Sequence, residues 1–315
     1  MKSSQQNPSQ QKPADWQHAP ERSNMLILRL MSWISLHLGR PAGRVLLRFI
    51  AAYFLLFAPA NRAASRDYLG RILQRPVRWT DIYRHFFCFA STVHDRIYFL
   101  NQRFDLFQIE VEGEQLIQQA LADGQGLFLL GAHMGSFEVI RALGNQHAGL
   151  QVAMVMYEEN ARKINRMLAA INPAVQQEVI ALGKVDSMLK VNACLQQGKA
   201  IGMLADRTLG DDVMQPATLL GGSANLPLGP LRMAAILRRP VFFMVGLYLG
   251  KNRYQIHFEQ LADFSGTPRG QRQFEIQQAL ARYAQLLEKY CQRAPYNWFN
   301  FFNFWQSASA KSKQD

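Results

Sequence analysis

The sequence predicts an α/β fold, with a single mixed, largely parallel sheet flanked by helices and an N-terminal membrane-associated helical segment. Short apolar runs alternate with helix-length runs from residue 107 onward, which is typical of βα units. Two longer apolar stretches come before them. No internal repeat or second domain boundary is visible, so one sheet accounts for most of the 315 residues.

The composition is that of a folded and strongly basic protein. Hydrophobic residues make up 49% of the chain and charged residues 18%, which is enough apolar material for a full core. The 35 Lys and Arg residues against 23 Asp and Glu give a formal net charge of +12. That balance favours a polyanionic partner, which is a nucleic acid, an anionic membrane, or an acidic protein or substrate.

The cysteines indicate a reducing compartment. Cys88, Cys194 and Cys291 are widely spaced and form no metal or disulfide pattern, so we expect inert core residues. No His, Cys and carboxylate spacing indicates a metal site. A secretory signal is not expected either, because apolar character begins only at Met25.

Composition divides the chain into four parts. Residues 1–24 are polar and rich in Gln, Ser and Pro, and we expect them to be disordered. Residues 25–60 are the expected membrane-associated hairpin or anchor, residues 61–305 the α/β domain, and residues 306–315 a second polar tail.

The anchor contains two apolar helical stretches, residues 25–38 and 45–58, which the breaker Gly39-Arg40-Pro41 separates. Each stretch would span about 21 Å as a helix, short of a hydrocarbon core of about 30 Å. We therefore expect a short helical hairpin embedded in the membrane or lying on it, although a tilted helix begun at Pro41 would nearly span. A pair of core helices in a soluble protein is the alternative, which the uniformly apolar stretch 49–57 disfavours.

A basic cluster follows the anchor. It consists of Arg62, Arg66, Arg71, Arg75 and Arg78. Arginines beside an apolar segment mark the cytoplasmic side of a membrane and attract anionic headgroups. The downstream domain is then expected in the cytoplasm, and a solvated charged face is the alternative.

The remaining elements follow from apolar periodicity. A helix with aromatic faces is expected at 80–104 and a short strand at 107–111. Further strands are expected at 127–132, 151–156, 177–181, 200–204, 216–220, 240–248 and 254–258. Further helices are expected at 114–122, 136–147, 159–170, 185–197, 229–238 and 270–292. The stretch 205–228, rich in Asp, Gly and Pro, is expected to be a long functional loop.

His133 and Glu138 stand where a strand is expected to turn into a helix. The apolar run 127–130 precedes them, Gly131-Ala132 ends it, and Ser136 is suited to cap the helix that follows. This is the usual crevice for chemistry in α/β sheets, and a carboxylate beside an imidazole fixes its tautomer and raises its basicity. The pair lacks a Ser or Cys nucleophile, so the base could activate a hydroxyl of the substrate. A capping or packing histidine is the alternative.

Three further segments carry candidate site residues. Asp206-Arg207 follows the apolar strand 200–204 and places an acid and a base at a second strand end. Residues 219–230 form a turn rich in Gly and Pro that leads into a helix near Pro230, whose free N–H groups can face an anion. The aromatic block 296–302 is suited to packing under or beside an acyl chain.

With these elements in this order, the sequence resembles the bacterial lysophospholipid acyltransferase superfamily, in the branch that contains the late lipid A acyltransferases, over residues 20–305. His133 and Glu138 match the family's His-x4-Asp/Glu motif. Asp206-Arg207 resembles its Asp-containing loop, Gly222 to Pro230 its Gly- and Pro-containing turn, and Tyr296-Asn297-Trp298 its terminal Tyr-x-Trp. The hydrophobic anchor is also a family trait.

One departure bears on the acceptor. The lipid A enzymes typically carry an Asp-Gln pair where this chain has Asp206-Arg207. Together with Glu21-Arg22-Ser23-Asn24 and the ending Tyr296 to Trp305, the departure resembles a divergent subgroup associated with aryl polyene and other polyketide- or fatty-acid-like lipid clusters. Lipid A itself is therefore not our first choice of acceptor.

The resemblance implies direct acyl transfer from a thioester to a hydroxyl of a lipid or glycolipid, without a covalent acyl-enzyme and without a bound cofactor or metal. His133 would take the hydroxyl proton and Glu138 would hold the imidazole. Gly135 and Ser136 would offer N–H groups to the oxyanion. The substrate-binding residues would be Asp206, Arg207, Gly222, Pro227, Gly229 and Arg232. Of these, Arg207 or secondly Arg232 would hold a phosphate of the donor or acceptor.

The expected co-substrate is acyl-ACP or acyl-CoA, and the acidic acyl carrier protein suits the basic surface. The other expected partners are an anionic membrane and a lipid acceptor. Nucleic acid is not expected, because the basic residues are spread along the chain without a recognition motif. The implied location is the bacterial inner membrane, with the acyltransferase domain of residues 61–305 on its cytoplasmic face.

Two other functions stay open. A thioesterase or lipid hydrolase would use the same His-Glu pair to activate water. A basic membrane- or nucleic-acid-binding protein would also explain the charge and the aromatic ending. The remaining histidines considered, His85, His94 and His257, are expected to be structural.

Overall fold

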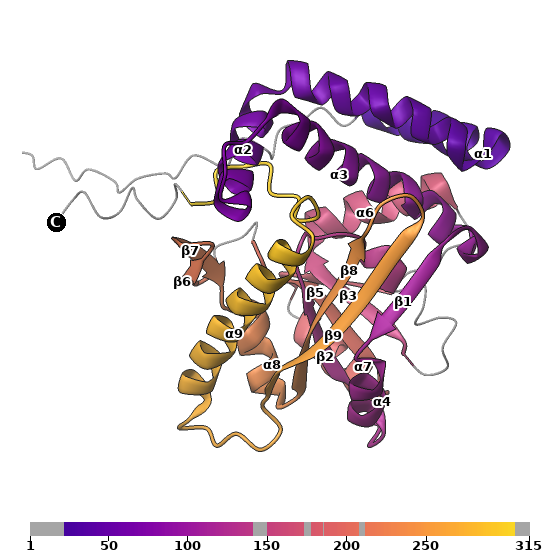
Figure 1. Ribbon diagram of the computed structural model, residues 1–315. Helices are drawn as coiled ribbons and strands as arrows, with labels where there is room; N and C mark the ends of the chain where they lie inside the picture. Colours follow the sequence, from indigo (N-terminus) through magenta and orange to yellow (C-terminus); the bar gives the residue numbers. More distant parts are fainter. Residues whose placement is uncertain (1–21, 141–149, 173–177, 185, 208–211, 306–315) are drawn as a thin grey trace, which may run out of the picture.

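The computed structural model describes residues 22–140, 150–172, 178–184, 186–207 and 212–305 (Figure 1). The two predicted polar tails lie outside the described residues, except that residues 22–24 begin the first helix.

Seven strands form one mixed sheet in the order β1-β9-β8-β2-β5-β3-β4. They are β1 (Gln108–Glu112), β2 (Leu127–Gly131), β3 (Val152–Tyr157), β4 (Val179–Leu182), β5 (Ala200–Leu204), β8 (Pro240–Tyr248) and β9 (Arg253–Asp263). Every neighbouring pair is parallel except β8 and β9, which are antiparallel. The predicted α/β class, with one mixed and largely parallel sheet, is confirmed.

Helices flank this sheet on both sides (Figure 1). They are α3 (Trp79–Leu100), α4 (Glu114–Leu121), α6 (Glu158–Ile171), α7 (Ser187–Gln196), α8 (Gly229–Leu237) and α9 (Arg272–Arg293). Each lies within a few residues of a predicted helix. Of the helix predicted at 136–147, residues 137–140 are helical, and residues 141–149 lie outside the described residues.

The central strand β2 explains why both faces of the sheet are covered. All five of its residues are buried. Leu130 belongs to a core with Leu287 of α9, whereas Leu129 belongs to a separate core with Phe99 of α3. A parallel strand that is buried on both faces carries a continuous apolar run rather than an alternating one. That run is the signal from which the sequence predicts this strand.

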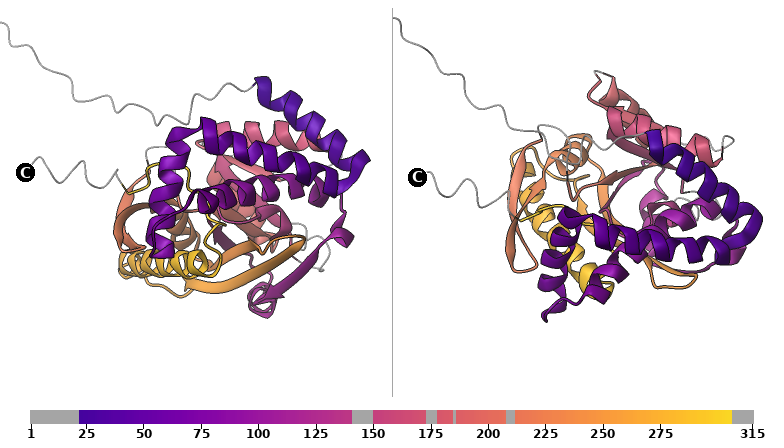
Figure 2. Two further views of the ribbon diagram at one scale, coloured as in Figure 1. Left: turned by 45° about the horizontal axis from the view of Figure 1, so that its top comes forward. Right: turned by 90° about the horizontal axis from the view of Figure 1, so that it is seen from above.

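Two N-terminal helices, α1 (Arg22–Phe57) and α2 (Pro59–Leu73), lie at the top of the molecule, with α1 along α3 (Figures 1 and 2). The predicted break is a kink inside α1, where Gly39 adopts φ 81° and ψ 168°. In the basic cluster, Arg62, Arg66 and Arg71 lie on α2, a helix that was not predicted. Among the described residues no single helix is long and apolar enough to cross a membrane, but Leu30–Phe57 and Pro59–Leu73 together satisfy length and composition across a 95° bend.

The stretch 205–228 corrects one prediction. The strand expected at 216–220 is present as β6 (Met214–Leu219), but it pairs with β7 (Gly222–Pro227) in an antiparallel hairpin in place of one long irregular loop. Its two-residue turn places Leu220 at φ 50° and Gly221 at φ 71°. Positive φ at both central residues is the signature of a type I′ turn, whose twist suits a hairpin. The Gly and Pro residues therefore mark a turn and strand ends.

Candidate active site

His133 and Asp206 meet because β2 and β5 are parallel neighbours. The last paired residues are Gly131 and Leu204, and the Ala205 amide donates to the Gly131 carbonyl at 2.9 Å. Two residues further along each strand, His133 Nδ1 and Asp206 Oδ1 lie 2.8 Å apart. The His133 amide also donates to the same oxygen at 3.2 Å. The strand register therefore sets this pair.

The position of Asp206 corrects the predicted role of Glu138. We expected Glu138 to hold the imidazole, but the carboxylate that binds Nδ1 is Asp206. Glu138 lies in the helical turn after the strand and is buried, and its Oε1 is 3.5 Å from Nε of Arg96 on α3. The spacing of five residues in sequence was the wrong guide to the partner of Nδ1, because the pairing is set across the sheet.

Asp206 is held as a charged group. Its side chain is fully buried, Trp298 Nε1 donates to its Oδ2 at 3.1 Å, and Arg207 Nη2 donates to the same oxygen at 3.0 Å. Burial opposes the charge of Asp206, but the charges of His133 and Arg207 and the hydrogen bonds from His133 and Trp298 lower its pKa below the usual range. A charged carboxylate can only accept hydrogen bonds, so Nδ1 of His133 carries the proton.

The imidazole of His133 is suited to take a proton at Nε2. With the proton on Nδ1, the neutral ring carries its lone pair on Nε2. The side chain remains 41% exposed, which leaves room for a substrate to approach. Loss of solvation lowers the pKa of His133, the Arg207 cation lowers it further, and Asp206 opposes both. The ring is therefore neutral at physiological pH.

The turn after His133 corrects the predicted oxyanion site. The Gly135 amide donates to the Asn297 carbonyl at 2.9 Å, and the Ser136 amide donates to the Gly246 carbonyl at 2.8 Å. Both N–H groups are thus bound to protein acceptors. Gly135 has φ +60°, and a Cβ atom there would lie 2.0 Å from the Gly246 oxygen, so only glycine fits.

The C-terminal aromatic block holds this turn in place. Met134 and Trp298 form an antiparallel bridge, and the Phe299 amide donates to the His133 carbonyl at 2.8 Å. The side chain of Asn297 accepts from the Tyr248 amide at 2.7 Å and donates to the Tyr248 carbonyl at 3.0 Å. Trp298 itself is fully buried. Sequence reasoning missed its contact with Asp206.

His85 of α3 contacts the backbone of Trp298. Its Nε2 lies 2.8 Å from the Trp298 carbonyl and its Nδ1 lies 2.8 Å from Oγ of Ser65 on α2. Burial lowers the pKa of His85 to about 4, although the bond to Trp298 opposes the shift. The ring is therefore neutral and structural, as its place in an aromatic helix predicted.

Arg207 lies in the site, where its Nε and Nη2 donors face Asp206. Besides its bonds to Asp206, Nη2 donates to the Phe299 carbonyl at 3.3 Å, and the guanidinium lies 4.8 Å above the Phe302 ring. Its side chain is largely buried. Arg207 thus contacts the carboxylate that binds His133. Its predicted role as a phosphate ligand stays a prediction.

The other predicted binding residues lie on the β6–β7 hairpin and on α8. A Cβ atom on Gly222 would come within 2.7 Å of Arg71 Nη1, so Gly222 permits close packing. A Cβ atom on Gly229 would come within 2.7 Å of Asp212 Oδ1. A carboxylate therefore already stands at the helix start where an anion was expected. Pro227 ends β7 and Arg232 lies on α8.

No group of three or more His, Cys, Asp or Glu side chains in the described part of the chain is arranged to hold a metal ion. The three cysteines are buried free thiols, and burial raises the pKa of Cys88 and Cys291.

A family model described as bacterial lipid A biosynthesis acyltransferase matches residues 89–307. The chain belongs to this family. None of the curated proteins matches it. The match to the lipid A acyltransferase family begins within α3 and includes His133, Glu138, Asp206 and the aromatic ending. The helices α1 and α2 lie before the matched residues.

Proposed function

We propose that this acyltransferase moves an acyl group from a thioester to a hydroxyl of a lipid or glycolipid, with His133 as the general base and Asp206 as its orienting carboxylate. The observation that carries the proposal is the 2.8 Å contact between His133 Nδ1 and a fully buried, charged Asp206, beside an imidazole that remains accessible. No protein nucleophile is needed, because the acceptor hydroxyl itself attacks.

In the proposed reaction, Nε2 of His133 removes the proton from the acceptor hydroxyl while its oxygen bonds to the thioester carbonyl carbon. Asp206 stabilises the imidazolium that forms. The tetrahedral intermediate then collapses, the carbon–sulfur bond breaks, and the imidazolium returns the proton to the leaving thiolate. The products are an ester and a free thiol.

Glu138 stays in the proposed site in a different role from the one first expected. Its carboxylate is buried and lies 3.5 Å from Arg96 Nε. We propose that Glu138 and Arg96 position the helix after the catalytic turn, so that Glu138 acts on the geometry of the site rather than on Nδ1.

The donor is proposed to be acyl-ACP or acyl-CoA. The formal charge of +12 suits both an acidic carrier protein and a phosphorylated carrier. For the acyl chain, an aromatic cluster stands beside His133: the Phe89 ring lies 5.1 Å from Phe299 and 5.5 Å from Phe301, and Phe89 is 41% exposed. Such a cluster offers an apolar approach from the surface to the catalytic turn.

We propose an inner-membrane location with the domain on the cytoplasmic face, where acyl thioesters are made. The acceptor is proposed to be a hydroxylated lipid of the aryl polyene or polyketide-lipid type rather than lipid A, because Arg207 replaces the usual Gln beside Asp206. Arg207 contacts the catalytic carboxylate, so this difference falls in the site itself.

A hydrolase is the second candidate, since an accessible His133 could equally activate water. The two reactions differ in product. Acyl transfer gives an acylated lipid and hydrolysis gives a free fatty acid.

The test is mass spectrometry of lipids from cells that carry the native chain or the His133→Ala variant. The proposal predicts that one acylated species disappears in the variant, and that species identifies acyl group and acceptor. His37→Ala, at an exposed histidine on α1, is the matched control and should leave the lipids unchanged. Unchanged lipids in His133→Ala, or release of fatty acid alone by the purified native chain, would refute the proposal.

A further inference from the structure

The kinked helix α1 has one face that is packed onto the domain along much of its length. Met31 and Ser35 before the kink are buried and four residues apart, and so are Leu47 and Ala51 after it, so each pair lies on one side of its helical segment. Gly43 lies four residues before Leu47, and a Cβ atom there would lie 2.2 Å from His94 Nε2 on α3. The His94 side chain of α3 therefore packs directly against the backbone of α1 at Gly43.

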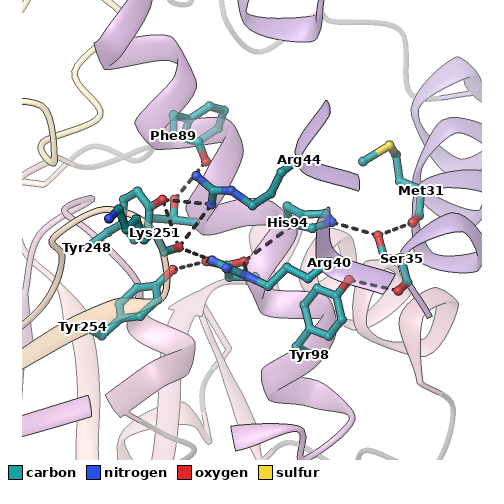
Figure 3. Close-up of polar contacts among 12 residues, drawn as sticks. Met31, Ser35, Arg40, Arg44, Phe89, His94, Tyr98, Tyr248, Lys251 and Tyr254 are labelled. Atoms are coloured by element: carbon teal, nitrogen blue, oxygen red, sulfur yellow. Dashed lines mark hydrogen bonds and ion pairs between the residues drawn. The ribbon is translucent and has the colours of Figure 1, made fainter. Parts of the chain in front are cut away.

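Buried polar contacts fix α1 in this position (Figure 3). Arg40 makes two hydrogen bonds of 2.8 Å to Asp95, a fully buried residue of α3 that also accepts from Tyr254 at 2.9 Å. Ser35 Oγ lies 2.9 Å from His94 Nε2. Breaking a buried ion pair leaves an uncompensated charge and is strongly destabilising, so α1 is held flat along α3.

The opposite face of α1 is apolar and exposed. We call it the outer face of α1 and define it by Trp33, Val45, Phe49, Tyr53, Leu56 and Phe57. Val45, Phe49 and Tyr53 are again four residues apart, and Phe49 and Phe57 are both 68% exposed. An exposed apolar patch rimmed by polar residues is typical of a surface that binds a membrane or another protein.

A cationic and aromatic border follows the outer face directly along the chain. Arg62 and Arg66 of α2 lie 5.2 Å and 5.7 Å from the ring centre of Trp79, which is 54% exposed. Arg48 is exposed within α1 itself. Tryptophan and arginine are suited to the headgroup level of a membrane, where a ring and a charge can both be accommodated, and arginine attracts anionic lipids.

We infer that the outer face of α1 inserts into one leaflet of an anionic bilayer, with α1 lying in the membrane plane instead of crossing it. A crossing orientation would carry α3 and the buried Arg40–Asp95 pair into hydrocarbon, because α1 is packed against them. The border of Arg62, Arg66 and Trp79 identifies the partner as a lipid surface with negative headgroups. This inference concerns the mode of membrane binding and does not depend on the reaction proposed above.

The first test is co-sedimentation of the purified full chain with vesicles. Vesicles of phosphatidylethanolamine and phosphatidylglycerol are compared with vesicles of phosphatidylcholine. Replacing Phe49 and Phe57 together by Gln should weaken binding to the anionic vesicles about tenfold or more, because two exposed aromatic side chains no longer leave water. The matched control replaces Leu189 and Phe274, which are 72% and 60% exposed on α7 and α9, and should bind like the native chain.

The second test measures the depth of α1 in the bilayer. Single cysteines at Val45, Phe49 and Tyr53 carry a fluorophore, and lipids with quenchers at fixed depths report each position; the chain's own three cysteines are buried. An in-plane helix predicts the same shallow depth at all three positions. A graded series of depths would mean a crossing helix and overturn the inference.

The vesicle results test two further parts of the inference, the contact surface and the recognition of negative headgroups. Equal binding of native chain and the Phe49→Gln, Phe57→Gln variant would exclude the outer face as the contact. Equal binding of the native chain to anionic and to phosphatidylcholine vesicles would exclude recognition of negative headgroups. Thermal unfolding of each variant in detergent checks that the fold is retained, and the depth measurement does not require these substitutions.

Discussion

Burial lowers the pKa of His133, and two adjacent residues at one strand end modify it: Arg207 lowers it further and Asp206 raises it. Arg207 bonds to Asp206 at 3.0 Å and its charge lowers the pKa of His133. A general base must be neutral to accept a proton, so activity should rise with pH through the pKa of His133. Because that pKa lies below the ordinary histidine value, activity should be nearly complete at neutral pH.

Removing the Arg207 charge should move this profile. In Arg207→Gln the cation no longer disfavours the imidazolium, and this raises the pKa of His133. The acidic limb of the kcat/KM profile should therefore shift to higher pH. Arg282→Gln, at a half-exposed arginine on α9, is the control and should keep the native profile. A shift to lower pH in Arg207→Gln would contradict the proposed electrostatics.

At the scale of elements, the catalytic turn after β2 depends on its close approach to β8. Gly135 and Gly221 both have positive φ, but a Cβ atom on Gly135 would lie 2.0 Å from the Gly246 oxygen, whereas Gly221 has open space. Gly221→Ala should cost only the left-handed penalty of about 1–2 kcal/mol. Gly135→Ala should lower the free energy of unfolding by more than this and should displace His133.

For Gly135→Ala and Gly221→Ala, chemical denaturation measures the free energy of unfolding, and kcat is measured beside it. A displacement of the base by about 1 Å lowers the rate about a hundredfold, so Gly135→Ala should lose activity while Gly221→Ala keeps it. Similar stability and activity in both variants would show that the close contact is not needed.

The contact of α2 and α3 with the C-terminal segment makes a second element-scale prediction. The pKa of His85 falls from 6.5 to about 4 on burial, so the unfolded chain binds a proton that the folded chain does not. Stability from this group is complete above the unfolded pKa and is lost as pH falls from about 6.5 towards 4. The free energy of unfolding should therefore drop by about 1.4 kcal/mol per pH unit over this range from His85 alone.

His85→Gln tests this directly, because an amide can hydrogen bond but does not titrate in this range. Its unfolding free energy in detergent should depend less steeply on pH, by about one proton, than that of the native chain. His37→Gln, at an exposed histidine, should keep the native slope. An unchanged slope in His85→Gln would mean that His85 is not buried as a neutral ring.

The elements themselves were largely predictable, because each has a local signal. The continuous apolar run of β2 and the alternating pattern of strands and helices gave the fold class, and Gly39-Arg40-Pro41 gave the kink in α1. In the stretch 205–228 one strand was predicted, but its partner β7 was missed because the Gly and Pro residues there resemble those of a loop. Local patterns do not report that a turn twists the chain back into a second strand.

The site was predictable only in part, because its contacts are not local. His133 was identified from its place at a strand end, and Asp206 from the end of another strand. Their pairing depends on β2 and β5 being neighbours, which no short pattern encodes. For the same reason, the sequence did not show that the N–H groups of Gly135 and Ser136 are already hydrogen bonded, because their acceptors lie more than a hundred positions away.

At the scale of the whole molecule, the charge of +12 predicts how the donor arrives. If acyl-ACP is the donor, electrostatic attraction accelerates its encounter with the basic chain and is screened by salt. The value of kcat/KM for acyl-ACP should then fall about tenfold between low salt and about 0.15 M. Independence from salt would argue against the carrier protein as donor.

The whole molecule also connects the outer face of α1 with the site. Arg44 of α1 donates to the Tyr248 hydroxyl at 2.9 Å, and the backbone of Tyr248 binds the Asn297 side chain. Asn297 in turn accepts from the Gly135 amide. A continuous set of contacts thus runs from the proposed membrane surface to the catalytic turn, which suits an enzyme whose acceptor lies in that membrane.

The most direct test of the account is the rate of acyl transfer to membrane lipid by Asp206→Asn, measured beside His133→Ala and Glu138→Gln. Asparagine keeps the shape of Asp206 but not its charge, so kcat should fall about a thousandfold or more. Asp263→Asn, at an exposed aspartate of β9, should retain the native rate. A near-native rate in Asp206→Asn, with activity lost in Glu138→Gln, would contradict the assignment of Asp206 as the partner of His133.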